Sequence, residues 1–286
     1  MSRVQQVNVL RTGAPVVSAL HVYPVKSLRG FSPGQAVVEP WGLAGDRRWM
    51  LIDARTRKAV TQREDARLAL LTAEPVGGGG LRVCAPGREP LDVAVPPPGE
   101  LETVGLFSHR IEVRPVGGAA DRWFGEFLEA PVRLVHLDDP AVRRPVDPRF
   151  AQPGETVSLA DGFPLLVTAA ASLEALNSWI AAGDHPEEGP LPMDRFRPNV
   201  VIDGTAPWAE DGWRRIRIGG IGFRVAKPCG RCVITTTDQS TGARGREPLR
   251  TLARHRKFGA QLVFGQNLIP EHSGTLRVGD PFLVVE

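Results

Sequence analysis

Cysteine, tyrosine and long apolar runs are all scarce in this chain of 286 residues. Its three cysteines do not make the disulfide framework of a secreted protein, so we expect a reduced, cytoplasmic protein. No stretch approaches the ~18 apolar residues of a membrane span, and Met1 to Val17 lacks a signal-peptide pattern, which predicts no membrane segment. With a net charge of only +3, scattered arginines and one tyrosine, nucleic-acid binding is not expected either.

Glycine and proline, by contrast, are abundant, at 31 and 26 residues. Both are poor helix formers, so long helices are disfavoured and a β-rich fold with many turns is predicted. Alternating apolar residues predict strands at 16–25, 35–39, 48–53, 68–72, 81–84, 111–116, 200–203, 215–218, 222–226 and 276–285.

Only short helices are expected. The apolar spacing of Leu173, Leu176 and Ile180 predicts a helix over 171–181 with Ser172 as its N-cap, and shorter helices are predicted over 121–128 and 247–256. From residue 131 to residue 155 the composition shifts to Pro, Asp and Arg. We therefore divide the chain near residue 130, into regions 1–130 and 131–286.

The strongest chemical signal is the pair Cys229 and Cys232 in Lys-Pro-Cys-Gly-Arg-Cys. A zinc site needs four ligands, and only Cys84 and isolated histidines remain to complete one. A redox dithiol is expected before a helix, whereas the threonine-rich segment after Cys232 favours a strand. Two interpretations remain beside these: inert packed thiols, or one soft thiolate for a transition metal whose other ligands come from a cofactor.

A second group of residues has the chemistry of anion binding. Lys26 and Ser27 end one predicted strand, Arg47 lies where another begins, and Arg197 and Asn199 precede a third. Guanidinium groups bind phosphate through short, charge-assisted hydrogen bonds. Taken singly, such residues are more often solvated surface charges, so composition alone does not select them.

Short motifs follow one another in a defined order from residue 16 to the end of the chain. They are YPVKS at 23–27, GDRRW at 45–49, VTQR at 60–63, the segments 161–166 and 171–177, RFRPN at 195–199, CGRC at 229–232 with its continuation to 242, FGQ at 264–266 and VGDP at 278–281. Together they resemble the MOSC family, in the branch that contains the mitochondrial amidoxime-reducing component and its bacterial relatives. The resemblance implies a β-rich α+β fold, with an N-terminal MOSC-type β-barrel region and a C-terminal MOSC β-barrel domain carrying a few short helices.

The resemblance also implies a molybdenum–molybdopterin cofactor, with Cys232 as the protein ligand of molybdenum. Positions that hold the pterin and its phosphate are matched by Lys26, Ser27, Arg47, Arg197 and Asn199. Asp161 and Thr237 fall in segments that line that site and are expected to contribute to cofactor binding. Cys229 has no ligand role by resemblance and is expected to be a packed thiol. Pyridoxal phosphate is not expected.

The activity implied by the resemblance is reduction of N-hydroxylated compounds such as amidoximes, hydroxylamines and N-hydroxylated bases. The chain has no clustered cysteines for an iron–sulfur centre, so electrons are expected from separate proteins, a ferredoxin- or cytochrome b5-like carrier and a flavin reductase. The alternative is a non-catalytic protein that binds or carries the cofactor or sulfur.

Overall fold

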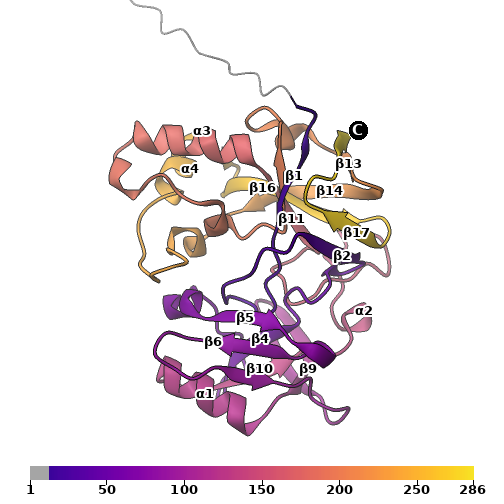
Figure 1. The fold of residues 1–286 in the computed structure, drawn as a ribbon, viewed down its shortest axis with the longest axis vertical. Helices are drawn as coiled ribbons and strands as arrows, with labels where there is room; N and C mark the ends of the chain where they lie inside the picture. The colour runs from indigo at the N-terminus through magenta and orange to yellow at the C-terminus, as the bar shows by residue number, and fades with distance from the viewer. Residues whose placement is uncertain (1–12) are drawn as a thin grey trace, which may run out of the picture.

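The computed structural model describes residues 13–286, so most of the Met1–Val17 segment considered for a signal peptide lies outside the described residues. Two bodies of β-structure lie one above the other in Figure 1. The upper body is a sheet ordered β1-β12-β11-β16-β14-β13-β18, with β15 paired to β16. Its strands are β1 (Val16–Leu20), β11 (Leu165–Ala169), β12 (Val200–Asp203), β13 (Arg215–Ile218), β14 (Ile221–Gly230), β15 (Lys257–Phe258), β16 (Gln261–Pro270) and β18 (Phe282–Val284).

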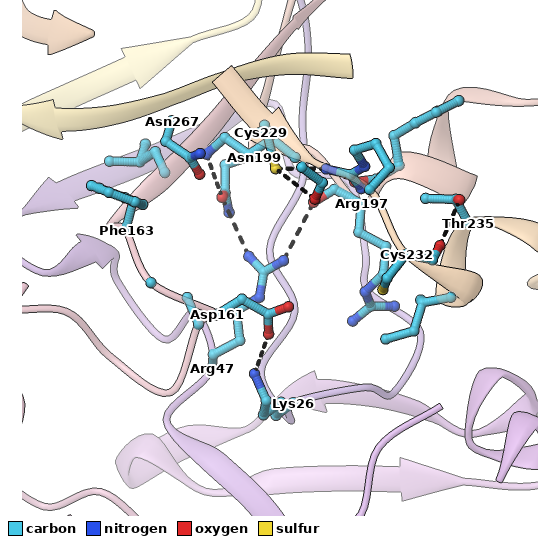
Figure 2. Close-up of a pocket in the computed structure, with 18 of the residues that line it drawn as sticks. Lys26, Arg47, Asp161, Phe163, Arg197, Asn199, Cys229, Cys232, Thr235 and Asn267 are labelled. Atoms are coloured by element: carbon cyan, nitrogen blue, oxygen red, sulfur yellow. Dashed lines mark hydrogen bonds and ion pairs between the residues drawn. The ribbon is translucent and has the colours of Figure 1, made fainter. Parts of the chain in front are cut away.

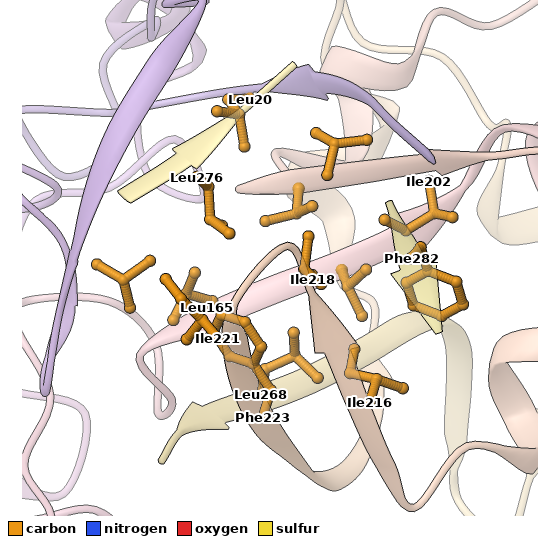
Figure 3. Close-up of a cluster of buried hydrophobic side chains, with 14 of the residues drawn as sticks. Leu20, Leu165, Ile202, Ile216, Ile218, Ile221, Phe223, Leu268, Leu276 and Phe282 are labelled. Atoms are coloured by element: carbon orange, nitrogen blue, oxygen red, sulfur yellow. The ribbon is translucent and has the colours of Figure 1, made fainter. Parts of the chain in front are cut away.

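The edges of this sheet meet, which makes it an almost closed barrel. The N–H of Phe282 donates to the carbonyl of Pro15 (2.8 Å), and the N–H of Val17 donates to that of Asp280 (2.9 Å). Along β13, exposed arginines alternate with buried isoleucines, as expected for a strand with one face in a core. Figure 3 shows the apolar side chains that fill this core, among them Leu20, Ile202, Ile216, Ile218, Phe223, Leu268 and Phe282.

The lower body contains two sheets and the α-helix α1. A four-stranded sheet has the order β4-β10-β9-β8, and a three-stranded sheet the order β5-β6-β7. The elements are β4 (Trp49–Asp53), β5 (Thr72–Pro75), β6 (Leu81–Cys84), β7 (Leu91–Val93), β8 (Glu102–Leu106), β9 (His109–Pro115), β10 (Val132–His136) and α1 (Gly118–Leu128). Helix α1 buries Phe124 and Leu128 against these strands, and Trp123 packs beside them.

The remaining elements are short. A third sheet has the order β17-β2-β3, from β2 (Gln35–Glu39), β3 (Gly42–Leu43) and β17 (Gly274–Arg277). The other α-helices are α2 (Pro140–Arg143), α3 (Ala170–Ala181) and α4 (Leu249–His255). The 3-10 helices are η1 (Ala66–Leu70), η2 (Gly77–Gly79), η3 (Pro186–Glu188), η4 (Met193–Phe196), η5 (Ala209–Gly212) and η6 (Val233–Thr236). No helix within residues 13–286 has both the length and the apolar character needed to cross a membrane.

Strand pairing crosses residue 130 in both directions. β1 pairs with β12 and β2 pairs with β17, so the first strands of the chain belong to the upper body. β10, which follows residue 130, pairs with β4 of the lower body. The chain therefore passes between the bodies more than once. A boundary near residue 130 does not coincide with the separation of the two bodies, and the division of the chain into two domains there stays a prediction.

Three local predictions are wrong. The strand expected at 68–72 is largely the 3-10 helix η1, because the Asp65 carboxylate caps it by accepting from the N–H of Arg67. Ser172 does not cap α3, which begins at Ala170; its hydroxyl is buried and donates to Glu210 instead (2.8 Å). The segment after Cys232 forms η6 rather than a strand, with Thr235 and Thr236 hydroxyls bonded back to backbone carbonyls.

Substitution of two neighbouring valines on β2 tests the register of the β17-β2-β3 sheet. Val38 is 0% exposed in the barrel core, whereas Val37 is 49% exposed. We expect Val38→Ala to lower the free energy of unfolding by about 2 kcal/mol, because it removes two buried methyl groups and leaves a cavity. Val37→Ala should change it by less than about 0.5 kcal/mol. Urea denaturation of both variants measures this, and a larger loss in Val37→Ala would mean that the strand is shifted by one residue.

Candidate functional site

A cavity of about 290 Å³ is lined by the loops that follow β1 and β3 and by residues of β11, β14 and β16 (Figure 2). All but one of the predicted site residues line it: Lys26, Ser27, Arg47, Asp161, Arg197, Asn199 and Cys232. Thr237 does not. It is 0% exposed, its hydroxyl oxygen has no hydrogen-bond partner in residues 13–286, and Ile234 and Thr235 form the wall in its place. The reason is that the segment after Cys232 folds into η6, which turns Thr237 away from the cavity, whereas an extended strand was expected there.

Arg47 and Arg197 form the centre of the cavity wall. Each guanidinium lies 4.3 Å from the ring centre of Tyr23, and Arg47 also donates to Asp46 (2.7 Å) and to the carbonyl of Arg197 (3.3 Å). Asn199 accepts from Arg47 (3.3 Å) and from the N–H of Leu166 (3.1 Å), which fixes its amide between the two. The two arginines are thus held side by side, although their charges repel.

Three residues of the cavity wall have strained backbone. Ser27, Arg47 and Arg197 have φ values of 69°, 47° and 53°, in the left-handed region that non-glycine residues rarely adopt. Such conformations cost roughly 1–3 kcal/mol each and cluster at functional sites. All three were selected from the sequence as anion binders, and the strained backbone places their side chains on the cavity.

Lys26 is almost completely buried at the base of the cavity. Its ammonium donates to the Asp161 carboxylate (2.5 Å) and to the carbonyl of Leu159 (2.9 Å). Burial lowers the pKa of Lys26 to about 8, and the charge of Asp161 only partly offsets this. Burial would raise the pKa of Asp161, but Lys26 and Arg63 outweigh it and keep the carboxyl well below its usual range. The Asp161 side chain is 61% exposed, but the surface it exposes faces the cavity.

Removal from water also acts on Arg197, whose pKa it lowers to about 10. The charged form of a guanidinium is disfavoured in this way where the group is shielded from water and has too little negative charge nearby. Arg197 donates to the Leu28 carbonyl (2.8 Å) and to Gln239 (3.3 Å), both of them neutral acceptors. The wall therefore holds positive charge that the protein does not fully neutralise.

The two cysteines of the CGRC motif both line the cavity, and both are partly exposed. Cys229 is not the packed thiol that was expected, because Arg231 approaches from the same wall and donates to its sulfur (2.8 Å). Within residues 13–286, the only cluster of potential metal ligands is His185, Glu187 and Glu188, and it contains neither cysteine. No protein ligand set for zinc is present around the cysteines in that range.

Several wall residues were not selected from the sequence. Arg63, Lys227 and Arg231 lie within or beside motifs quoted above, so their positions along the chain were a usable signal. Phe163 lies within the quoted segment 161–166 and Asn267 directly follows the FGQ motif, so both also had a usable signal. The pairing of β16 with β11 and β14 carries Asn267 to the cavity.

Comparison with known proteins fits this geometry. The MOSC N-terminal beta barrel domain matches residues 14–131, and the MOSC domain matches residues 154–283. The chain is 32% identical over 284 residues to human mitochondrial amidoxime-reducing component 1, covering 93% of this chain and 81% of the human protein. The chain belongs to the MOSC family. The family resemblance and the β-rich fold predicted from the sequence are therefore confirmed.

Two further relatives are similar to this MOSC protein over different shares of their own length. The mouse mitochondrial amidoxime-reducing component 1 is 34% identical over 286 residues, which cover 93% of this chain and 81% of that protein. A molybdenum cofactor sulfurase from rice is 29% identical over 262 residues, which cover 87% of this chain but only 32% of that protein. The MOSC chain is thus similar to most of the length of the amidoxime-reducing components and to about a third of the larger sulfurase.

The lowered pKa of Lys26 predicts a pH dependence of stability in the cofactor-free MOSC protein. Between pH 8 and the ordinary lysine pKa of 10.5, the unfolded chain binds more protons at this residue than the folded chain does. The free energy of unfolding should therefore rise through that window, by on the order of 1–3 kcal/mol from this residue. Lys26→Met should lack this rise, and Lys58→Met, at an exposed lysine, should keep it. Urea denaturation across the window measures the slopes, and equal slopes in all three proteins would show that Lys26 has an ordinary pKa.

Proposed function

We propose that this MOSC protein binds a molybdenum–pterin cofactor in the cavity and reduces N-hydroxylated compounds such as amidoximes, hydroxylamines and N-hydroxylated bases. The observation that carries the proposal is the meeting of an accessible thiol, Cys232, with incompletely neutralised cations in one cavity. The names of the amidoxime-reducing relatives support the reaction, and those of the cofactor sulfurases support the cofactor.

The donor set fits such a cofactor. Six basic side chains line the cavity against the single carboxylate of Asp161: Lys26, Arg47, Arg63, Arg197, Lys227 and Arg231. An excess of desolvated cations suits an anion with phosphate groups. Cys232 offers a soft sulfur donor of the kind that transition metals prefer, and it is the thiol matched by the family motif. Lys26, Ser27, Arg47, Arg197 and Asn199 would hold the phosphate and pterin.

When bound, the molybdenum–pterin group would supply the two-electron chemistry that removes oxygen from the substrate nitrogen, consuming two protons and releasing water. The chain's own residues orient the reactants. Asp161 holds Lys26 and Arg63 in place (2.5 and 3.2 Å). Because both cations keep its pKa low, Asp161 stays ionised and is unsuited to donate a proton.

Electrons would come from separate proteins, a ferredoxin- or cytochrome b5-like carrier and a flavin reductase. A cytoplasmic location remains part of the proposal. The similarity to a molybdenum cofactor sulfurase favours one alternative, a protein that binds or delivers the cofactor or sulfur without turnover. Both functions need the same cofactor site, and only the first predicts reduction of benzamidoxime by the loaded protein with reduced viologen as electron donor.

The two cysteines should respond differently to substitution. Cys232→Ala should abolish molybdenum-dependent reduction of benzamidoxime, because it removes the protein's metal ligand. Cys229→Ala should keep most of the activity, because it removes only a hydrogen-bond acceptor of Arg231, a change of about 1 kcal/mol. Steady-state rates with reduced viologen measure both. Equal loss in the two variants with the cofactor still bound would point to a dithiol mechanism.

The central arginines should control cofactor retention. Each hydrogen bond to a charged group contributes roughly 1.5–3 kcal/mol, so Arg47→Ala and Arg197→Ala should weaken retention about 10- to 150-fold. Pterin content per chain is the measurement, and exposed Arg55 is the matched control. Arg57 is unsuitable as a control because it forms an ion pair with Glu102. Full pterin content in both variants, or unfolding of their cofactor-free forms, would contradict a binding role.

A further inference from the structure

Lys227 differs from the other basic residues of the cavity wall. Within residues 13–286 its ammonium has no carboxylate within 4.0 Å and no hydrogen-bond acceptor. Each of the others is engaged by the chain: Lys26 and Arg63 by Asp161, Arg47 by Asp46, Arg197 by the Leu28 carbonyl, and Arg231 by the Phe196 carbonyl. The Asp147 carboxylate acts on Lys227 only from beyond ion-pair distance, and it is already paired with Arg149 (2.6 Å). Most of the charge of Lys227 is therefore left for a group from outside the chain.

Two aromatic rings hold this ammonium in place without neutralising it. Lys227 Nζ lies 5.0 Å from the ring centre of Phe150 and 5.8 Å from that of Phe163. The two rings pack edge to face, with their centres 5.8 Å apart. Cation–π contacts of this kind orient a cation while leaving its positive charge intact. Lys227 and Phe163 thus present a charge and a flat apolar surface to the same cavity.

An irregularity in β14 sets the position of Lys227. Val225 pairs with Leu268 and Lys227 pairs with Asn267, so Ala226 is an extra residue on this strand. A bulge of this type bends the strand and re-aims its side chains, and bulges are common beside active sites. The Asn267 amide donates to the Lys227 carbonyl (3.3 Å), and its side chain also lines the cavity.

The resulting surface lies apart from the proposed metal ligand. In Figure 2, Phe163 and Asn267 lie on one side of the cavity, whereas Cys232 and Thr235 lie on the other, with Arg47 between them. The cations assigned to the cofactor's phosphate belong to the central and lower wall. Phe163, Lys227 and Asn267 therefore form a second surface in the same cavity, which combines an aromatic ring, a positive charge and an amide.

We propose that Phe163, Lys227 and Asn267 form a substrate subsite that selects flat, conjugated N-hydroxylated compounds carrying an anionic substituent such as a carboxylate. The inference rests on the proposed reductase function and names the class of substrate. The conjugated group lies against Phe163, the carboxylate pairs with the ammonium of Lys227, and the amide of Asn267 offers polar contact. A compound with a cationic substituent is repelled at the same point.

The test uses the cofactor-loaded protein, benzamidoxime, and its para-carboxylate and para-aminomethyl derivatives. Lys227→Met keeps the length of the side chain and removes its charge. It should lower kcat/KM for the carboxylate about ten-fold, mainly through KM, and change that for benzamidoxime less than about two-fold. The same variant should have a higher kcat/KM for the aminomethyl compound, because the repelling charge is gone. Lys58→Met, at an exposed lysine outside the cavity wall, should match the wild type for all three.

Two further readouts separate this subsite from the cofactor site and from the reaction. Molybdenum and pterin content should be unchanged in Lys227→Met; a loss would overturn the proposal by assigning Lys227 to the cofactor. Equal rate losses on all three compounds, or none, would also overturn it. Calorimetric binding of para-carboxybenzamidine, the reduced product, tests the subsite without turnover. If no compound is reduced but this binding still depends on Lys227, the reductase function fails and the anion subsite stands.

Discussion

Positive charge buried around a single cavity is the constraint on which the rest of this structure depends. Taking a cation out of water is costly unless it gains a partner, and several cations side by side also repel one another. The chain offsets part of this cost with Asp46, Asp161, the ring of Tyr23 and backbone carbonyls. The low pKa values of Lys26 and Arg197 show that the offset is incomplete. A site of this kind is stabilised by an anion, which gives the cavity its chemistry.

The fold supplies that cavity by bringing distant segments together. From β1 in the barrel the chain runs along the cavity past Lys26 and Arg47 into the lower body, and it later returns through β11 and β12. Left-handed backbone at Ser27, Arg47 and Arg197 is tolerated because the surrounding strands hold these turns. Ser27 and Arg47 lie on the segments that follow β1 and β3, which lead from the upper body to the lower one, whereas Arg197 lies on the loop before β12.

Much of this could be predicted from the sequence, for identifiable reasons. Strands such as 35–39 and 200–203 were predicted with the bounds they have, because each contains a valine-rich run bounded by turn-forming residues. The segments η1 and η6 were mistaken for strands, because side-chain hydrogen bonds from Asp65, Thr235 and Thr236 override β-propensity. Most of the residues that the motifs proposed for binding line the cavity, whereas Thr237 lies behind its wall. Phe163 and Asn267 were not selected although they lie within or beside quoted motifs, since the tertiary structure decides which residues of a motif reach the cavity.

We propose that Cys232 completes the coordination of a molybdenum–pterin group held by the cations of this cavity. X-ray absorption at the molybdenum edge of the loaded protein tests it most directly, because it counts the sulfur neighbours of the metal. The account predicts one sulfur neighbour more in the wild type than in Cys232→Ser, and the wild-type number in Cys229→Ser. An unchanged sulfur count in Cys232→Ser, or a loss of sulfur in Cys229→Ser, would contradict it.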